Sequence, residues 1–166
     1  LEEAERYVSE EKGVSSSQEA LAGAMDILAE RISDNAKSRT YIRRATRDQG
    51  TIQSLAKDPK EKSVYEHYYE YEEPVRKCAG HRVLALNRGE AEKYLTVKIL
   101  APEDVILKYL EKQVVTRDNP HTSPVLRSVI EDSYKRLIAP SIEREIRGEL
   151  TDKAEDGAIR VFGKNL

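Results

Sequence analysis

Apolar residues recur at helical spacing near the start of the chain. The stripe consists of Leu21, Met25, Leu28 and Ile32. Intervals of three and four residues place these side chains on one face of a helix. Ser16 and Glu19 have the spacing of a capping box, in which two side chains satisfy N–H groups at a helix start. The pattern predicts a helix over residues 16–33.

A second helix is predicted over residues 35–48. Asp34 is its candidate N-cap, and Gly50 is placed to end it. Its inward face is expected to hold Ala36, Tyr41, Ile42 and Ala45. With only a tight turn between them, the two helices predict a helical hairpin.

Two short segments alternate apolar and polar residues as strands do. The segment "TIQSLAKDP" begins at Thr51, and "YLTVKIL" covers residues 94–100. Strands this short need partners, so we expect these two to pair. Between them, Asp58 and Pro59 with Glu61 resemble a capped helix start, which predicts a helix through about Tyr69.

The remaining elements are helices separated by breakers. Residues 81–88 predict a short helix that Gly89 ends, and Pro102 starts another helix. The segment 116–124 is rich in breakers and predicts a surface loop. In the long helical region beyond it, Pro140 is expected to kink or break the helix after Leu137 or Ile138.

These elements predict a mostly α fold: a multi-helix array with a hairpin and a minor two-stranded β element. Three regions are expected: a helical hairpin region at 1–56, a mixed helical lobe at 57–122 with a strand near 94–100, and long C-terminal helices at 123–166. Because apolar patterns run up to both ends, we expect a piece of a longer chain.

Composition restricts the function classes. Lys and Arg total 28 against 30 acidic residues, a net charge of -2, so attraction to nucleic acid or anionic lipid must be local. Cys78 is the single cysteine, which excludes an internal disulfide and fits a reducing cytoplasm. No apolar stretch approaches the roughly 20 residues of a membrane span. We expect a soluble cytoplasmic protein without membrane contact.

The candidates for catalysis and metal binding are weak. Cys78 and His81 have a spacing that supplies half of a zinc site, but His67 and His121 stand alone elsewhere. A reactive Cys78 with His81 as base needs a third orienting group, and none is identifiable. The sequence therefore predicts no catalytic residue, no metal and no cofactor.

Basic residues cluster in two places. Arg39, Arg43 and Arg47 are spaced by four on one helix face. This first group is completed by Lys37 and Arg44, and the second consists of Arg76, Lys77, Arg82 and Arg88. Two interpretations stay open: phosphate contact with nucleic acid, or pairing with acids elsewhere, such as the run from Glu66 to Glu73, and with neighbouring domains.

A run of tyrosines, "YEHYYEYEEP", could be a base-stacking platform. Its glutamates would repel a phosphate backbone, so packing at the edge of the core is the expected role.

Several blocks of the sequence resemble the Tex family of bacterial transcription accessory proteins. They are "HRVLALNRGE", "LTVKI", "YKRLIAPSIEREIRGEL" and "KAEDGAIRVFGKNL", in matching order and spacing. The resemblance extends from "AMDILAERISDNA" to "FGKNL" and implies the N-terminal helical portion of a larger protein, with a helix-turn-helix-like hairpin. It also implies downstream nucleic-acid-binding domains, among them a β-barrel. Asn87 departs from the family pattern, where a larger apolar or aromatic residue is expected.

The expected function is a non-enzymatic module that orients downstream RNA- or DNA-binding domains and contributes sequence-independent phosphate contacts. The alternative is a protein-interaction scaffold that docks on the transcription machinery or on its own downstream domains.

Overall fold

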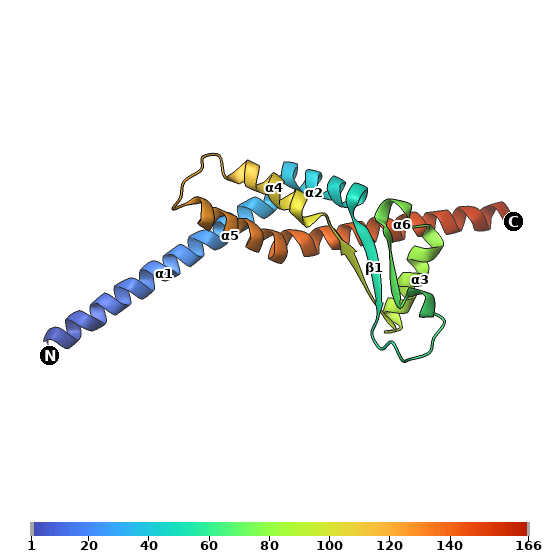
Figure 1. Ribbon diagram of the computed structural model, residues 1–166, viewed down its shortest axis with the longest axis horizontal. Helices are drawn as coiled ribbons and strands as arrows, with labels where there is room; N and C mark the ends of the chain where they lie inside the picture. Colours follow the sequence, from blue (N-terminus) through green and yellow to red (C-terminus); the bar gives the residue numbers. More distant parts are fainter. Residues whose placement is uncertain (1, 166) are drawn as a thin grey trace.

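The molecule is elongated, with a mixed body and a helix extending from each end (Figure 1). The structure is a computed structural model that describes the backbone of residues 2–165 and the side chains of residues 17–163. Helix α1 (Glu2–Asp34) extends from one end, and α6 (Ala139–Asn165) extends from the other. The predicted mostly α fold with a minor β element is confirmed.

Helix α2 (Ala36–Gln49) begins one residue later than the predicted cap implied. Asn35, not Asp34, is the N-cap: its Oδ1 accepts a hydrogen bond from the Ser38 N–H at 3.0 Å. Gly50 is the C-cap, as expected. The buried face consists of Ser38, Ile42, Ala45 and Thr46. Ile42 and Ala45 are buried as predicted, but Ala36 and Tyr41 were predicted to face inward and are exposed instead; the Tyr41 ring stacks on Tyr109 and does not enter the core.

The first two helices are consecutive along the molecule. Only Asn35 lies between them, and Figure 1 shows α2 running on from the end of α1 toward the sheet instead of back along α1. Helix α2 contacts α6 and the 3₁₀ turn η2 (Val75–Lys77) more extensively than α1. Packing against these later elements, and not a hairpin with α1, therefore positions α2.

The sheet has three antiparallel strands in the order β2-β1-β3. The expected pairing is confirmed, because β1 (Thr51–Ala56) pairs with β3 (Leu95–Leu100). The third strand, β2 (Glu70–Pro74), was not predicted and pairs with the other edge of β1. Its sequence, "EYEEP", is rich in glutamate, which is uncommon in strands. This segment forms a strand because the free edge of β1 provides backbone hydrogen-bonding partners for it.

The helix predicted from Asp58 to Tyr69 is wrong. The Asp58 carboxylate accepts the Lys60 N–H at 3.0 Å in a local turn, and the segment continues to a single 3₁₀ turn, η1 (Glu66–Tyr68). Tyr65 is buried in the core. The Asp58 side chain therefore caps a turn and not a helix. The tyrosines pack as expected at the edge of the core.

Helix α3 (Gly80–Ala91) contains the predicted short helix and continues past Gly89, which therefore does not end it. The C-cap is Glu92, and Lys93 follows with a positive φ of 67°. Helix α4 (Glu103–Val114) begins after Pro102, as expected. The predicted surface loop lies between α4 and α5 (Ser123–Ser133).

Pro140 does not break the last helical region. A π-helical turn, η3 (Tyr134–Ile138), lies between α5 and α6, and the Ala139 N–H donates to the Tyr134 carbonyl. This wider turn occurs where a disruption was expected, directly before a proline that cannot donate an N–H. The helix continues, and α5, η3 and α6 follow one another along the molecule (Figure 1).

Candidate nucleic-acid interface

Three of the predicted phosphate-contacting arginines lie between α2 and α6. Arg43 Nε donates to Glu145 Oε2 at 2.5 Å, and Arg47 Nε donates to Glu149 Oε2 at 2.9 Å. Arg39 donates to the Ser141 hydroxyl at 3.0 Å. We call these contacts the α2–α6 ladder; it consists of Arg39, Arg43, Arg47, Ser141, Glu145 and Glu149. The arginines of α2 and their partners on α6 are both spaced by four residues, so the two rows of side chains lie opposite each other.

The ladder pairs three arginines with two glutamates, so most of its charge is neutralised internally. The hydrogen bond from Arg47 lowers the pKa of Glu149, and the same bond raises the pKa of Arg47. Arg39 is further held by Ser33, whose carbonyl and hydroxyl accept from its guanidinium at 2.5 and 2.9 Å. Pairing with acids was one of the two interpretations left open. For these three arginines the structure shows it, with α6 supplying the acids in place of the run from Glu66 to Glu73.

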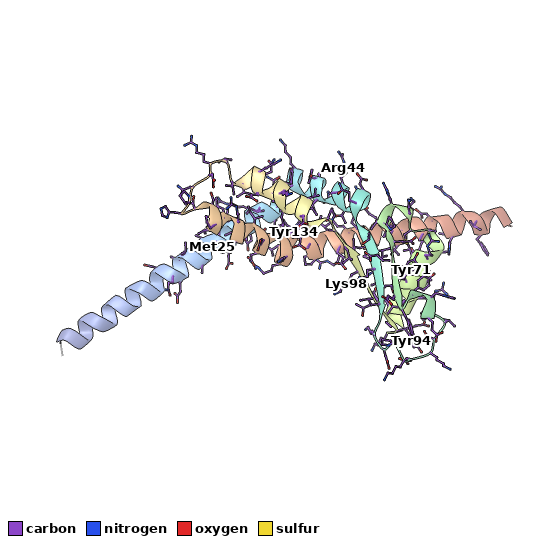
Figure 2. The ribbon with its side chains drawn as sticks, viewed as in Figure 1. Met25, Arg44, Tyr71, Tyr94, Lys98 and Tyr134 are labelled. Carbon is purple, nitrogen blue, oxygen red and sulfur yellow. The ribbon has the colours of Figure 1, made fainter. Side chains whose placement is uncertain are left out.

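The outer face of α2 carries the rest of the first basic group. Lys37 and Arg44 are exposed and make no ion pair among the described residues, and Figure 2 shows Arg44 on the outer side of the helix. Tyr41 lies between them in sequence and stacks on Tyr109 of α4, with ring centroids 3.8 Å apart and planes 7° from parallel. Lys37 and Arg44 therefore lie on a solvent-facing surface on either side of this stacked pair in the sequence.

The second basic group is divided in the same way. Arg82 is bound to Glu73 through two hydrogen bonds of 2.8 and 3.1 Å. Arg76, Lys77 and Arg88 are exposed and have no ion pair within the described part of the chain. Of the nine candidate residues, five are exposed and have no ion pair among the described residues: Lys37, Arg44, Arg76, Lys77 and Arg88.

Sequence reasoning missed Arg147 of α6, which joins α6 to α3 and the sheet. Its guanidinium donates to Glu90 Oε1 at 2.8 Å, to Asn87 Oδ1 at 2.9 Å and to the Val97 carbonyl at 3.2 Å. Asn87 also donates to the Thr151 hydroxyl at 2.9 Å. The polar residue at position 87 thus has a structural reason. The available signal was its departure from the family pattern, although its partner lies 60 residues away.

Cys78 has the environment of an inert thiol. Burial and the neighbouring Glu73 carboxylate raise the pKa of Cys78 to about 12, whereas a nucleophilic cysteine needs a lowered pKa. His81, three residues later, is exposed. Among the described residues, no group of three or more His, Cys, Asp or Glu side chains is arranged to hold a metal ion.

A family model described as Tex central region-like matches residues 1–162. The chain belongs to this Tex family. The resemblance found in the sequence is therefore confirmed, although the matching model describes the central region and the sequence analysis had indicated the N-terminal helical portion.

The Tex-family chain is similar to much longer proteins. It is 52% identical over 166 residues to the uncharacterized protein YdcI of Bacillus subtilis, covering 98% of this chain and 23% of that protein. It is 31% identical to the human S1 RNA-binding domain-containing protein 1, covering 93% of this chain and 17% of that protein. The transcriptional accessory protein Tex of Neisseria gonorrhoeae is 27% identical, with 98% and 22% covered. The chain thus spans about a fifth of the length of these relatives.

No helix in the described part of the Tex-family chain is long and apolar enough to cross a membrane.

Proposed function

We propose that this chain is a non-enzymatic module that orients the nucleic-acid-binding domains of a Tex-family protein and adds weak phosphate contacts. The observation that carries the proposal is the α2–α6 ladder. Together with Arg147, it holds α6 from two sides, by α2 and by α3 with the sheet. A function alongside nucleic acid is consistent with a human relative named for an S1 RNA-binding domain.

Helix α6 is fixed in the core at its start and extends out of the body at its end (Figure 1). Ile142 and Ile146 in its first half are buried in the core, while its last turns extend beyond the body (Figure 1). A single exposed ion pair contributes about 0–1 kcal/mol. Several pairs on both sides of one helix oppose both rotation and tilting of that helix. The orientation of a domain attached to the C-terminal end of α6 would therefore be fixed by the contacts at the start of the helix.

The orienting function is tested in the full-length protein by charge reversal in the ladder. Arg43→Glu places two carboxylates together, so we expect a broader distribution of interatomic distances in small-angle X-ray scattering and weaker binding of labelled RNA. Adding Glu145→Arg should restore both. Arg44→Glu is the matched control on the outer face of α2, and it should leave the scattering curve unchanged. A wild-type scattering curve for Arg43→Glu would contradict the orienting function.

The phosphate contacts are proposed to come from the five exposed cations and not from the ladder. Fluorescence anisotropy of labelled single- and double-stranded RNA and DNA over a salt series tests this. For Lys37→Gln/Arg44→Gln we expect the slope of log K against log salt to flatten by about 0.7–0.9 for each phosphate that the variant no longer neutralises. An unchanged slope would remove this face from the interface.

The alternative function is a scaffold that docks on the transcription machinery or on downstream domains. The exposed cations Arg76, Lys77 and Arg88 support it, since they also fit an acidic protein surface. Reversal of these charges would then weaken protein partners while nucleic-acid affinity stays unchanged.

A further inference from the structure

An apolar cleft of about 920 Å³ lies between the second half of α6, the start of α3 and η2. Its apolar walls include Val75, Val83, Leu84, Leu150, Val161 and Phe162. Val161 and Phe162 are 61% and 68% exposed. Contiguous exposed apolar surface of this kind marks an interaction site.

The cleft has a close-packed end and an open end. Near Gly80, a Cβ atom would lie 3.1 Å from the Cα of Ala154, so the start of α3 rests almost directly on the α6 backbone. Further along α6 the cleft is lined by the exposed side chains of Val161 and Phe162. An open channel along a helix fits another helix, whose apolar side chains enter it at intervals of three or four residues.

The rim of the cleft carries excess positive charge. Arg76 and Lys153 are exposed and unpaired among the described residues, whereas Arg47 and Glu149 neutralise each other. Asp48 is the remaining acid on the rim. The cleft therefore favours an apolar helix face accompanied by carboxylates.

Helix α1 of the same chain has these properties. Ala20, Leu21, Ala24 and Ile27 are all exposed and form one continuous strip of its surface, with Leu21 60% and Ile27 54% exposed. Glu19 and Glu30 are exposed on the same stretch, and no Lys or Arg lies between residues 17 and 30. Helix α1 leaves the body at the end opposite the last turns of α6 (Figure 1), and those turns line the cleft, so α1 cannot reach the cleft of its own chain.

We propose that α1 of one copy docks in the α3–α6 cleft of a second copy. The contact joins two different surfaces, so it repeats head to tail instead of closing a symmetric pair. It buries Leu21 and Ile27 against Val161 and Phe162 and brings the acids of α1 near Arg76 and Lys153. This contact does not depend on the proposed function.

The test is sedimentation velocity of the chain over a concentration series, with two double variants. Leu21→Glu/Ile27→Glu alters only the α1 strip, and Val161→Glu/Phe162→Glu alters only the cleft. Wild type should form species larger than a monomer as concentration rises, and each variant alone should remain monomeric. An equimolar mixture of the two variants retains one intact strip and one intact cleft, so it should form a 1:1 dimer and nothing larger.

The control is Val64→Glu, at a residue that is 84% exposed outside both surfaces; it should associate like wild type. Circular dichroism should show the same helix content for all variants, because every substituted side chain is exposed. The proposal is overturned if wild type stays monomeric up to its solubility limit, if either double variant associates like wild type, or if the mixture stays monomeric.

Discussion

Gly89 and Gly148 both lie inside helices, but only Gly89 has atoms where a side chain would be. A Cβ on Gly89 would lie 2.4 Å from Leu95 Cδ1 and 2.8 Å from Leu95 Cγ, whereas a Cβ on Gly148 would meet nothing within 4 Å. Leu95 is fully buried, so it has little room to move. The absence of a side chain at position 89 lets α3 lie close to β3.

We expect opposite effects from the same substitution at these two glycines. Gly89→Ala should lower the free energy of unfolding by about 1–3 kcal/mol, because overpacking outweighs the better helix propensity of alanine. Gly148→Ala should raise it by about 0.5–1 kcal/mol. Urea denaturation measures both. Stabilisation by Gly89→Ala would show that α3 and β3 have room for a methyl group between them.

Cys78 should alkylate slowly. With a pKa of about 12 in place of 9.0, its thiolate fraction at pH 8 is about a thousand times smaller than that of an unperturbed thiol. We expect iodoacetamide to react with it at least about 30-fold more slowly than with an exposed cysteine, because the higher nucleophilicity of a high-pKa thiolate offsets only part of the loss of thiolate. The rate should rise with pH up to about 12.

The control for this reaction is Val64→Cys in a Cys78→Ser background, since position 64 is exposed. Glu73→Gln should accelerate alkylation of Cys78, because it removes the negative charge beside the thiol. Equal rates for Cys78 and the control would contradict the burial of this thiol.

At the scale of elements, α6 combines a core helix with an exposed extension. Ile146 is 1% exposed and Ile159 is 69% exposed, although both belong to the same helix. Helix α6 contacts α2, α3 and β3, while its last turns extend past the body (Figure 1). Helix formation and core formation are therefore separate properties of this element.

Two matched substitutions on α6 measure that difference. Ile146→Ala should lower the free energy of unfolding by about 2–5 kcal/mol, because it leaves a cavity in the core. Ile159→Ala should change it by less than about 0.5 kcal/mol. Both values come from urea denaturation of the chain. A large destabilisation by Ile159→Ala would mean that the end of α6 is packed in solution.

The elements that the sequence predicted well are those with strong local signals. The alternation in residues 95–100 places Leu95, Val97 and Ile99 on the buried side of the sheet. Helix α1 was predicted from its apolar stripe, but it begins at Glu2 and not at Ser16, and Leu21 of that stripe is exposed. Strand β2 lacks such a signal, because its glutamates are tolerated only at an exposed sheet edge. The capping signal at Asp58 was real but formed a turn.

At the scale of the whole molecule, carboxylates paired with arginines connect separate elements of the fold. Glu149 joins α6 to α2, and Glu73 joins β2 to α3. Burial acts to raise the pKa of Glu73, but hydrogen bonds from Arg82, Cys78 and Tyr71 lower it overall. The hydrogen bond from Arg47 lowers the pKa of Glu149.

These lowered pKa values predict sensitivity to acid. A carboxylate whose pKa is lower in the folded state contributes stability above its ordinary pKa of 4.5 and loses that contribution as pH falls through the folded value. We expect the urea midpoint to fall as pH is lowered below about 4.5. Glu149→Gln should make this fall shallower. Glu155→Gln, at an exposed position without an ion pair in the described part of α6, should leave it unchanged.

The sequence by itself determined the helical class, most helix positions, the β1–β3 pairing and the family, because these depend on local periodicity and on ordered blocks of residues. It also placed Arg39, Arg43 and Arg47 on one face. Only the tertiary structure decided what that face contacts: the partners Glu145 and Glu149 lie 102 residues away. No local pattern encodes such a distance, and packing alone divided the basic residues into those paired with acids and those exposed without an ion pair in the described part of the chain.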